Sequence, residues 1–271
     1  MDKINSLATE RIGKLLLKYS IPAIVAMLVM ASYNVVDRIF VGRGVGALAI
    51  SGITITFPLI LLQLGFGMLI AIGSTALVSI RLGEKKSEEA EKILGNSITL
   101  SIIVGLLLFI PGIIFMDDLL YMFGARGEVL VYAKDFMSIL IFGVVFTSIT
   151  FSLNNIIRGQ GKPNMAMITI VSTAVLNVIL NPIFIFGLHM GVKGSALATV
   201  IAQFYGMCLV LWFYLSKRSS IKLHLKNLIL KKEIVSKILM IGASSFVMQL
   251  AGSAVTIIFN KELSHFGGDI A

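Results

Sequence analysis

Polar side chains recur at a regular spacing inside the otherwise apolar segment TIVSTAVLNVILNPIFIF, which begins at residue 169. A spacing of four residues, which lines up side chains along one ridge of a helix, is shared by Thr169, Thr173, Asn177 and Asn181. Pro182 follows at once and cannot donate a hydrogen bond to the carbonyl of Val178. A freed carbonyl beside two amide side chains would suit a cation. The same side chains would also suit hydrogen bonding between membrane helices, and the segment alone leaves both interpretations open.

A carboxylate, Asp37, follows another long apolar run, in the stretch YNVVDRIFVGRG (33–44). Tyr33 lies four residues earlier and would share a helix face with it. Asp37 lies 22 residues after Leu15, a helical rise of ~33 Å, which is close to the ~30 Å thickness of the hydrocarbon core. Asp37 is therefore either an interfacial acid paired with Arg38 or solvent, or an intramembrane acid, a type of residue that marks function.

The composition supplies the helices that would hold these side chains. Of 271 residues, 57% are hydrophobic and 14% charged, whereas soluble chains are ~45–50% apolar and ~25% charged. We therefore predict an all-α, multi-pass membrane protein. The charged residues divide the chain into seven predicted spans, at 15–37, 50–80, 93–116, 135–157, 164–187, 193–215 and 236–260. The second predicted span follows an external loop, is entered near Ser51 and contains Pro58 early in the helix.

The basic residues predict the orientation of the chain. Of the 23 Lys and Arg residues, 17 fall on one side of the predicted spans and 6 on the other, so the basic side, with the N-terminus, is expected to be cytoplasmic. Two basic segments, RLGEKKSEEAEK (81–92) and SKRSSIKLHLKNLILKK (216–232), are expected to form solvated or amphipathic helices that contact lipid headgroups. We expect no nucleic-acid binding from them.

The seventh predicted span looks like a repeat of the first. With a shift of 223 residues and no gap, Lys14 matches Lys237, Asp37 matches Asn260, and Gly44 matches Gly267. Transporters are commonly built from such repeats. We therefore predict a six-helix lobe over 1–215, a basic cytoplasmic linker over 216–233, and over 234–271 the first helix of a second, truncated lobe.

Several stretches together carry a resemblance to a known family. They are SIPAIVAMLVMASYNVVDRIFVGRGVGALAISGIT, SIRLGEKKSEEA, IIRGQGKPNMAM and LNVILNPIFIFGLHMGVKGSALATVIAQ, in this order. The chain resembles the N-terminal part of MATE (multidrug and toxic compound extrusion) transporters over essentially its whole length. The resemblance implies two lobes around a cavity, alternating access in the plasma (inner) membrane, and export of small amphipathic or cationic substrates driven by inward Na+ or H+. We expect a lipid-embedded monomer with no cofactor besides the coupling ion.

The resemblance also implies roles for particular residues. The cation site of the first lobe matches Asp37, Asn177 and Thr199, and Asn181 stands where many members have Asp. The match implies that Tyr33 and Asn154 line the cavity and that the first helix bends at Pro22. Asn154 would serve equally well for capping or packing near the predicted helix end at Gly159 or Gly161. A site with one carboxylate is expected to hold a monovalent cation more weakly than a site with two, and the choice between Na+ and H+ stays open.

Two other functions are weighed against export. A flippase for lipid-linked precursors would need a wide cationic cavity, and the predicted spans contain few Lys or Arg. A membrane-embedded enzyme would need a catalytic constellation, but Asp117 and Asp118 lie in a predicted external loop without a His at useful spacing. The single cysteine, Cys208, and three scattered histidines show no metal-ligand pattern. We therefore predict a transporter and not an enzyme.

Overall fold

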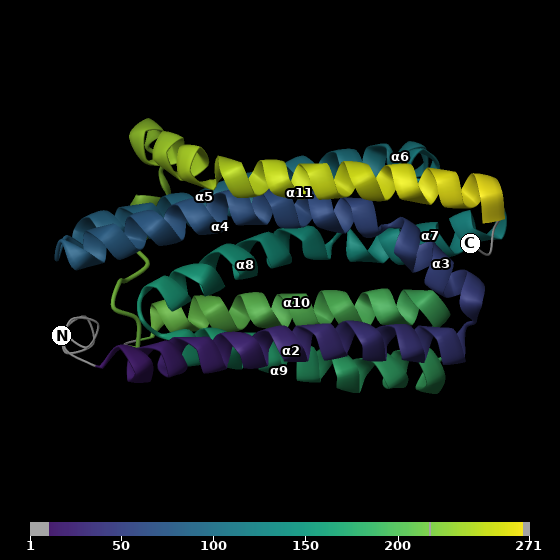
Figure 1. Ribbon diagram of the computed structural model, residues 1–271, viewed down its shortest axis with the longest axis horizontal. Helices are drawn as coiled ribbons and strands as arrows, with labels where there is room; N and C mark the ends of the chain where they lie inside the picture. The colour runs from purple at the N-terminus through teal and green to yellow at the C-terminus, as the bar shows by residue number, and fades with distance from the viewer. Residues whose placement is uncertain (1–10, 217, 268–271) are drawn as a thin grey trace.

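The structure is a computed structural model that describes residues 11–216 and 218–267. Lys3 and Lys217, which contribute to the predicted charge bias, lie outside the described residues, and so does the side chain of His265. Every regular element in the described part of the chain is helical, and the long helices run side by side in an elongated bundle (Figure 1). The predicted all-α fold is confirmed.

The helices supply up to seven membrane spans in the described residues. Four of them are α2 (Ile12–Gly44), α5 (Ser87–Ile114), α10 (Gly191–Leu215) and α11 (Lys232–Gly267). Two more are composite: α3 (Ala47–Ile55) continues into α4 (Phe57–Gly83), and α9 (Pro163–Pro182) continues into the π-helical turn η1 (Ile183–Gly187). The bent pair α7 (Gly127–Leu140) and α8 (Gly143–Gly159) makes the seventh. The chain is thus a multi-pass membrane protein.

The start of the second span differs from the prediction. No external loop precedes it; only Val45 and Gly46 separate α2 from α3. Thr56 ends α3 by donating its hydroxyl to the carbonyl of Ile53 at 2.7 Å. Pro58 lies in the first turn of α4, where its missing N–H has no helical partner to lose. The long uncharged stretch is therefore two helices joined end to end, with α3 inclined to α4 (Figure 1).

The fourth span, predicted as one helix over 135–157, is broken instead. Helices α7 and α8 meet at an angle of 58° across Ile141 and Phe142. Gly143 begins α8 directly against α10, where an added Cβ would overlap the side-chain oxygen of Gln203. The segment before α7, predicted as an external loop, is partly helical, because Asp117 and Asp118 lie on the short helix α6 (Met116–Met122). The break contains no proline, and the observed feature beside it is the close approach of Gly143 to α10.

The main apolar core lies between α4, α5, α8, α10 and α11. Its fully buried members include Ile70, Leu94, Leu153, Ile156 and Ile238. Helix α2 lies at the opposite side of the bundle from α11 and packs mainly on α9 (Figure 1). Both α2 and α11 leave large apolar side chains exposed, such as Met27 at 67% and Met248 at 76%. In a membrane protein such faces contact lipid or further helices.

Helices α4 and α11 are joined by a close antiparallel seam. An added Cβ at Gly73 would overlap the carbonyl oxygen of Ile238, and one at Gly242 would overlap the carbonyl oxygen of Leu69. Farther along, Ser253 donates its hydroxyl to the carbonyl of Pro58 at 3.0 Å. Small residues allow this backbone approach, which is how membrane helices associate without a hydrophobic driving force.

Candidate functional site

Asp37 lies inside α2 and does not mark its end. The helix continues without interruption for two further turns, to Gly44. The Asp37 side chain is half-buried, whereas the neighbouring Arg38 is exposed. Of the two interpretations left open by the sequence, the structure therefore favours an acid held within the span.

Asp37 is held by donors from two other helices. Its Oδ1 accepts a hydrogen bond from the side-chain amide of Asn181 on α9 at 2.7 Å and another from the hydroxyl of Ser195 on α10 at 2.9 Å. Both donors are fully buried, with 0% exposure. One carboxylate thus joins three helices of the bundle.

The hydrogen bonds continue from Asn181 into a small polar network. The same Asn181 amide nitrogen also donates to Oδ1 of Asn177 at 2.7 Å. Asn177 in turn donates to the hydroxyl of Thr199 at 3.1 Å, and Thr199 donates to the backbone carbonyl of Ser195 at 3.0 Å. The four predicted cation-site residues therefore converge: Asp37, Asn177, Asn181 and Thr199. Whether they bind a cation stays a prediction.

One oxygen in the network has no hydrogen-bond partner among the described residues. It is Oδ1 of Asn181, which is buried. An unpartnered buried acceptor is costly, typically by ~1–3 kcal/mol. The network also contains the Asp37 carboxylate and the hydroxyls of Ser195 and Thr199, and oxygen atoms are the ligands that hard cations prefer. The residues present therefore fit a small cation or a proton on Asp37.

The turn after Asn181 explains how three helices meet there. Pro182 ends α9, and the chain widens into the π-helical turn η1; such turns occur frequently at functional sites. Two glycines pack on this turn: an added Cβ at Gly44 of α2 would overlap the side chain of Ile185, and one at Gly194 of α10 would lie 2.9 Å from the carbonyl carbon of Phe184. Their absent side chains bring α2 and α10 close to α9 beside Asn181.

The predicted ridge of polar residues on α9 is only half correct. Thr169 and Thr173 do not reach the network but donate to carbonyls of their own helix, Met165 at 3.1 Å and Thr169 at 2.8 Å. A four-residue step advances the side-chain direction by about 40° on a helix of ~3.6 residues per turn. Three such steps rotate Thr169 well away from the face that carries Asn181.

The residues predicted to line a cavity lie in different surroundings. Tyr33 is one helical turn before Asp37, is half-buried, and its side chain approaches Thr199. Asn154 on α8 is buried and donates to the backbone carbonyl of Ala166 on α9 at 3.0 Å, a packing contact of the kind that the sequence left open. Pro22, the predicted bend, is buried within the uninterrupted helix α2. Their roles in transport stay predictions.

Ser195 is the member of the network that the sequence did not identify. With Gly194 and Ala196, its small size predicts only close helix packing. The available signal was its spacing of four residues from Thr199, which puts the two on the same face of α10. Only the position of α10 relative to α2 assigns its hydroxyl to Asp37.

We expect Ser195→Ala to destabilise the protein by ~1.5–3 kcal/mol, because a buried hydrogen bond to a charged acceptor is lost. The measurement is thermal or denaturant unfolding of the purified protein in detergent. Ser172→Ala is the matched control, because Ser172 donates only to a carbonyl of its own helix, Thr169, at 3.1 Å. A double-mutant cycle with Asp37→Asn should give a coupling of ~1 kcal/mol for Ser195 and near zero for Ser172; equal coupling for both serines would contradict the contact.

Similarity to a known family and to curated relatives extends over most of the chain. The MatE family model matches residues 22–183. Among curated relatives, the chain is 27% identical to "Multidrug export protein MepA" of Staphylococcus aureus (strain MRSA252) over 254 residues, covering 94% of the chain and 56% of the relative. It is 28% identical to the protein of the same name from Staphylococcus haemolyticus, covering 94% of the chain and 57% of the relative. The chain thus spans little more than half the length of these relatives.

Solved structures are similar over almost the whole chain. One is described as a MATE multidrug transporter, DinF-BH, in complex with the dye rhodamine 6G; it has a TM-score of 0.91 and 39% identity, with 96% of this chain and 58% of that one covered. Another, "Crystal structure of MATE in the bent conformation", has a TM-score of 0.86 and 28% identity, with 99% and 60% covered. A third is a MOP superfamily transporter from Pyrococcus furiosus, for which reverse polarity of the binding pocket suggests a different function; its TM-score is 0.85 at 28% identity, with 94% and 56% covered.

Proposed function

The chain belongs to the MatE family, and from this premise we propose that it forms the first lobe of a secondary active exporter of small amphipathic or cationic compounds. In this proposal residues 1–215 are the first lobe, 216–233 a cytoplasmic linker, and 234–271 the first helix of a second lobe. The basic side and the N-terminus face the cytoplasm across the plasma (inner) membrane, and the protein works as a monomer. The observation that carries the proposal is a carboxylate inside α2, Asp37, that accepts hydrogen bonds from α9 and α10.

Asp37 is the proposed switch. Asn181 and Ser195 donate hydrogen bonds to Oδ1 of Asp37. A proton or a cation that neutralises the Asp37 carboxylate weakens these two hydrogen bonds. A ligand shifts a conformational equilibrium only by its differential affinity for the two states. Neutralisation of Asp37 weakens the attachment of α2 to α9 and α10 and so favours a second arrangement of α2, for which Pro22 is the proposed hinge. Substrate contacts in the cavity fall to Tyr33 and Asn154.

The coupling ion is Na+ or H+. The unpartnered Oδ1 of Asn181 supports a coordinated cation, and the single carboxylate supports a protonation switch. In either case Asp37 is the group that binds the coupling ion, because it is the carboxylate of the network described above. No further cofactor enters the proposal.

The alternatives are less well supported. A flippase for anionic lipid-linked precursors would need cationic side chains in its cavity, and the network around Asp37 is built of neutral donors with Arg38 exposed beside it. The Pyrococcus furiosus transporter indicates that pocket polarity and function vary on this fold, so the substrate class must be measured. The family consists of transporters, with relatives named for multidrug export, which argues against the enzyme alternative.

Transport by the complete protein in proteoliposomes tests the proposal, with rhodamine 6G as the probe and the Na+ and pH gradients imposed separately. We expect efflux of the dye with at least one inward gradient and none without a gradient. Efflux driven by a Na+ gradient at equal pH identifies Na+, and efflux driven by a pH gradient without Na+ identifies H+. Several chemically distinct cationic dyes are tested in the same way. If neither the Na+ gradient nor the pH gradient changes the efflux of any of them, coupled export is contradicted.

A further inference from the structure

A strongly basic pocket of ≈ 560 Å³ lies at the end of the bundle away from Asp37. It is formed by the end of α4, the beginning of α5, and the first residues of α11. Seven charged side chains line it, and five of these are cationic: Arg81, Lys92, Lys231, Lys232 and Lys237. The other two, Glu89 and Glu233, leave a net formal charge of +3.

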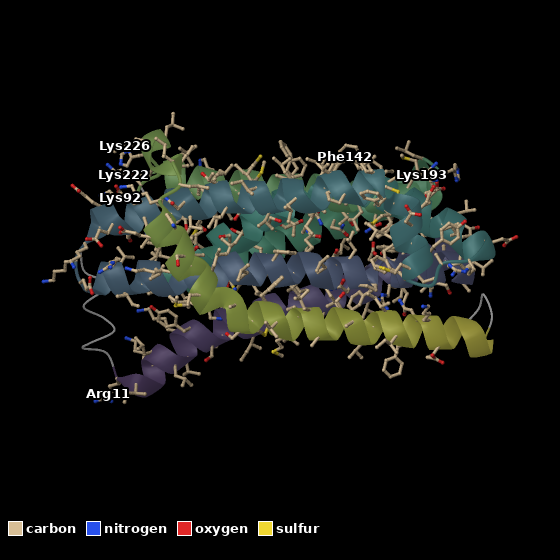
Figure 2. The ribbon with its side chains drawn as sticks, turned by 90° about the horizontal axis from the view of Figure 1, so that it is seen from above. Arg11, Lys92, Phe142, Lys193, Lys222 and Lys226 are labelled. Atoms are coloured by element: carbon tan, nitrogen blue, oxygen red, sulfur yellow. The ribbon has the colours of Figure 1, made fainter. Side chains whose placement is uncertain are left out.

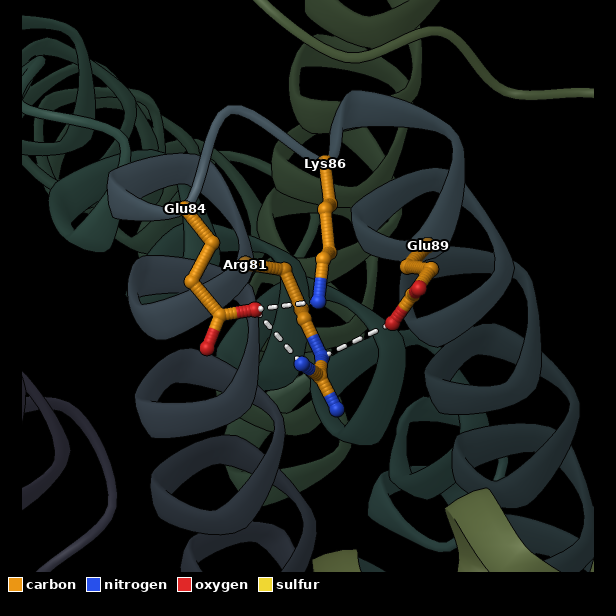
Figure 3. Close-up of polar contacts among 4 residues, drawn as sticks. All are labelled: Arg81, Glu84, Lys86 and Glu89. Atoms are coloured by element: carbon orange, nitrogen blue, oxygen red, sulfur yellow. Dashed lines mark hydrogen bonds and ion pairs between the residues drawn. The ribbon is translucent and has the colours of Figure 1, made fainter.

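Most of this positive charge is not neutralised within the protein. Arg81 is the exception: its guanidinium binds Glu84 at 2.6 Å and Glu89 at 2.9 Å, and Glu84 also binds Lys86 at 3.1 Å (Figure 3). Hydrogen bonding from Arg81, reinforced by Lys86, lowers the pKa of the Glu84 carboxyl. Among the described residues, the ammonium groups of the four pocket lysines form no ion pair, which leaves them available to an anion: Lys92, Lys231, Lys232 and Lys237.

The pocket is built on a linker that is fixed to α5. The predicted amphipathic helix over 216–232 is absent from the described part of that segment, which has only the short 3₁₀ turn η2 (Leu225–Leu228). Asn96 of α5, fully buried, donates to the carbonyls of Asn227 and Ile229, both at 3.3 Å, and accepts the backbone N–H of Lys231 at 2.7 Å. These bonds hold Lys231 and Lys232 at the pocket instead of leaving them on a free helix.

A second α5 contact completes the attachment of the linker. Thr99 donates its hydroxyl to the carbonyl of Leu228 at 2.7 Å, and Gly95 packs directly beneath Asn227, whose carbonyl oxygen would overlap an added Cβ. The seam between Gly73 and Ile238 fixes the start of α11 on α4 in the same way. All three walls of the pocket are thus set before any ligand arrives, which lowers the entropic cost of binding.

The remaining walls and the surroundings point to a lipid. The apolar side chains Leu77, Ile93 and Ile234 also line the pocket. At the same end of the bundle, the guanidinium of Arg218 stacks over Trp212 at 5.0 Å, and tryptophan is enriched at membrane–water interfaces. Basic pockets between membrane helices on the cytoplasmic side bind anionic lipid headgroups. Figure 2 shows Lys92, Lys222 and Lys226 at this end of the bundle, with Lys193 at the other.

We propose that this pocket binds the headgroup phosphate of an anionic phospholipid, with Lys92, Lys231, Lys232 and Lys237 as the phosphate contacts. The apolar side chains take the glycerol and the first acyl methylenes. A net charge of +3 matches a headgroup with more than one phosphate better than one with a single phosphate. The site does not depend on the transport mechanism proposed above.

Native mass spectrometry of the complete protein in detergent tests the proposal, with cardiolipin, phosphatidylglycerol and phosphatidylcholine titrated separately. We expect retention of cardiolipin, then phosphatidylglycerol, over phosphatidylcholine. Lys92→Gln with Lys232→Gln should lower the affinity for cardiolipin roughly tenfold. The matched control, Lys222→Gln with Lys226→Gln, removes the same charge from exposed lysines of the linker outside the pocket. Because solvent and salt screen these exposed charges, the control should change the affinity less than about twofold.

Glu233→Gln removes an acid from the pocket and should therefore raise the affinity for cardiolipin. A misfolded variant would lose affinity, so this result cannot be explained by misfolding. Soluble glycerol phosphate and inorganic pyrophosphate are titrated against bound cardiolipin. This competition distinguishes a lipid headgroup from a free phosphate as the ligand. Equal losses in the pocket and control variants, or no preference over phosphatidylcholine, would overturn the site. Displacement of cardiolipin by either soluble phosphate at equal concentration would overturn a lipid as the ligand.

Discussion

Asp37→Asn is expected to reduce gradient-driven efflux by the complete protein about 100-fold, to the level of empty vesicles. Coupling between sites is typically worth ~1–3 kcal/mol, or about 5- to 150-fold, and Asn cannot change its charge when a proton or cation arrives. The asparagine keeps a side-chain oxygen that can accept from Asn181 and Ser195, so the fold is expected to remain. The measurement is rhodamine 6G efflux from proteoliposomes under each imposed gradient.

The matched control is Asp117→Asn on α6. Asp117 is 54% exposed and pairs with Lys134 at 2.8 Å, and exposed pairs contribute only ~0–1 kcal/mol. This variant should transport within about twofold of the unaltered protein. If Asp37→Asn still gives full gradient-driven efflux while its thermal unfolding is unchanged, Asp37 is not the coupling residue.

Gly73→Ala should destabilise the protein by ~3 kcal/mol, the upper part of the range for overpacking. The new methyl group would overlap the backbone oxygen of Ile238, and neither helix backbone can move without opening the seam between α4 and α11. This loss should exceed the helix-propensity gain of ~1 kcal/mol that alanine normally has over glycine. The measurement is unfolding in detergent together with size-exclusion profiles of the folded fraction.

Gly83→Ala makes the same change at the end of the same helix, where nothing lies within 4 Å of the added Cβ. It should leave stability unchanged or slightly higher, since only helix propensity acts there. An unfolding curve for Gly73→Ala that coincides with that of Gly83→Ala would show that the close seam does not exist in the protein.

The membrane spans and the polar residues inside them could be predicted from the sequence, because each depends only on residues close together along the chain. Spans follow from runs of ~20 apolar residues, which a reader of the sequence can count. The intramembrane polar residues stand out against their neighbours for the same reason, and four of them converge in the structure, as the family resemblance implied. The broken span at Ile141 and Phe142 could not be found in this way, because its close contact at Gly143 is with Gln203 of a helix distant in the sequence.

The amino-acid sequence predicted an all-α membrane protein and identified Asp37 as a candidate intramembrane acid. The hydrogen-bond partners of Asp37 became known only from the arrangement of the helices. Ser195 reaches Asp37 across 158 residues and Asn96 reaches Asn227 across 131, and such contacts depend on how each helix is rotated against its neighbours. Hydrophobic runs fix that a helix spans the membrane but not this rotation. For this reason the sequence did not predict that Thr169 lies away from the network, that Ser195 belongs to it, or that Lys231 of the basic linker lines a pocket.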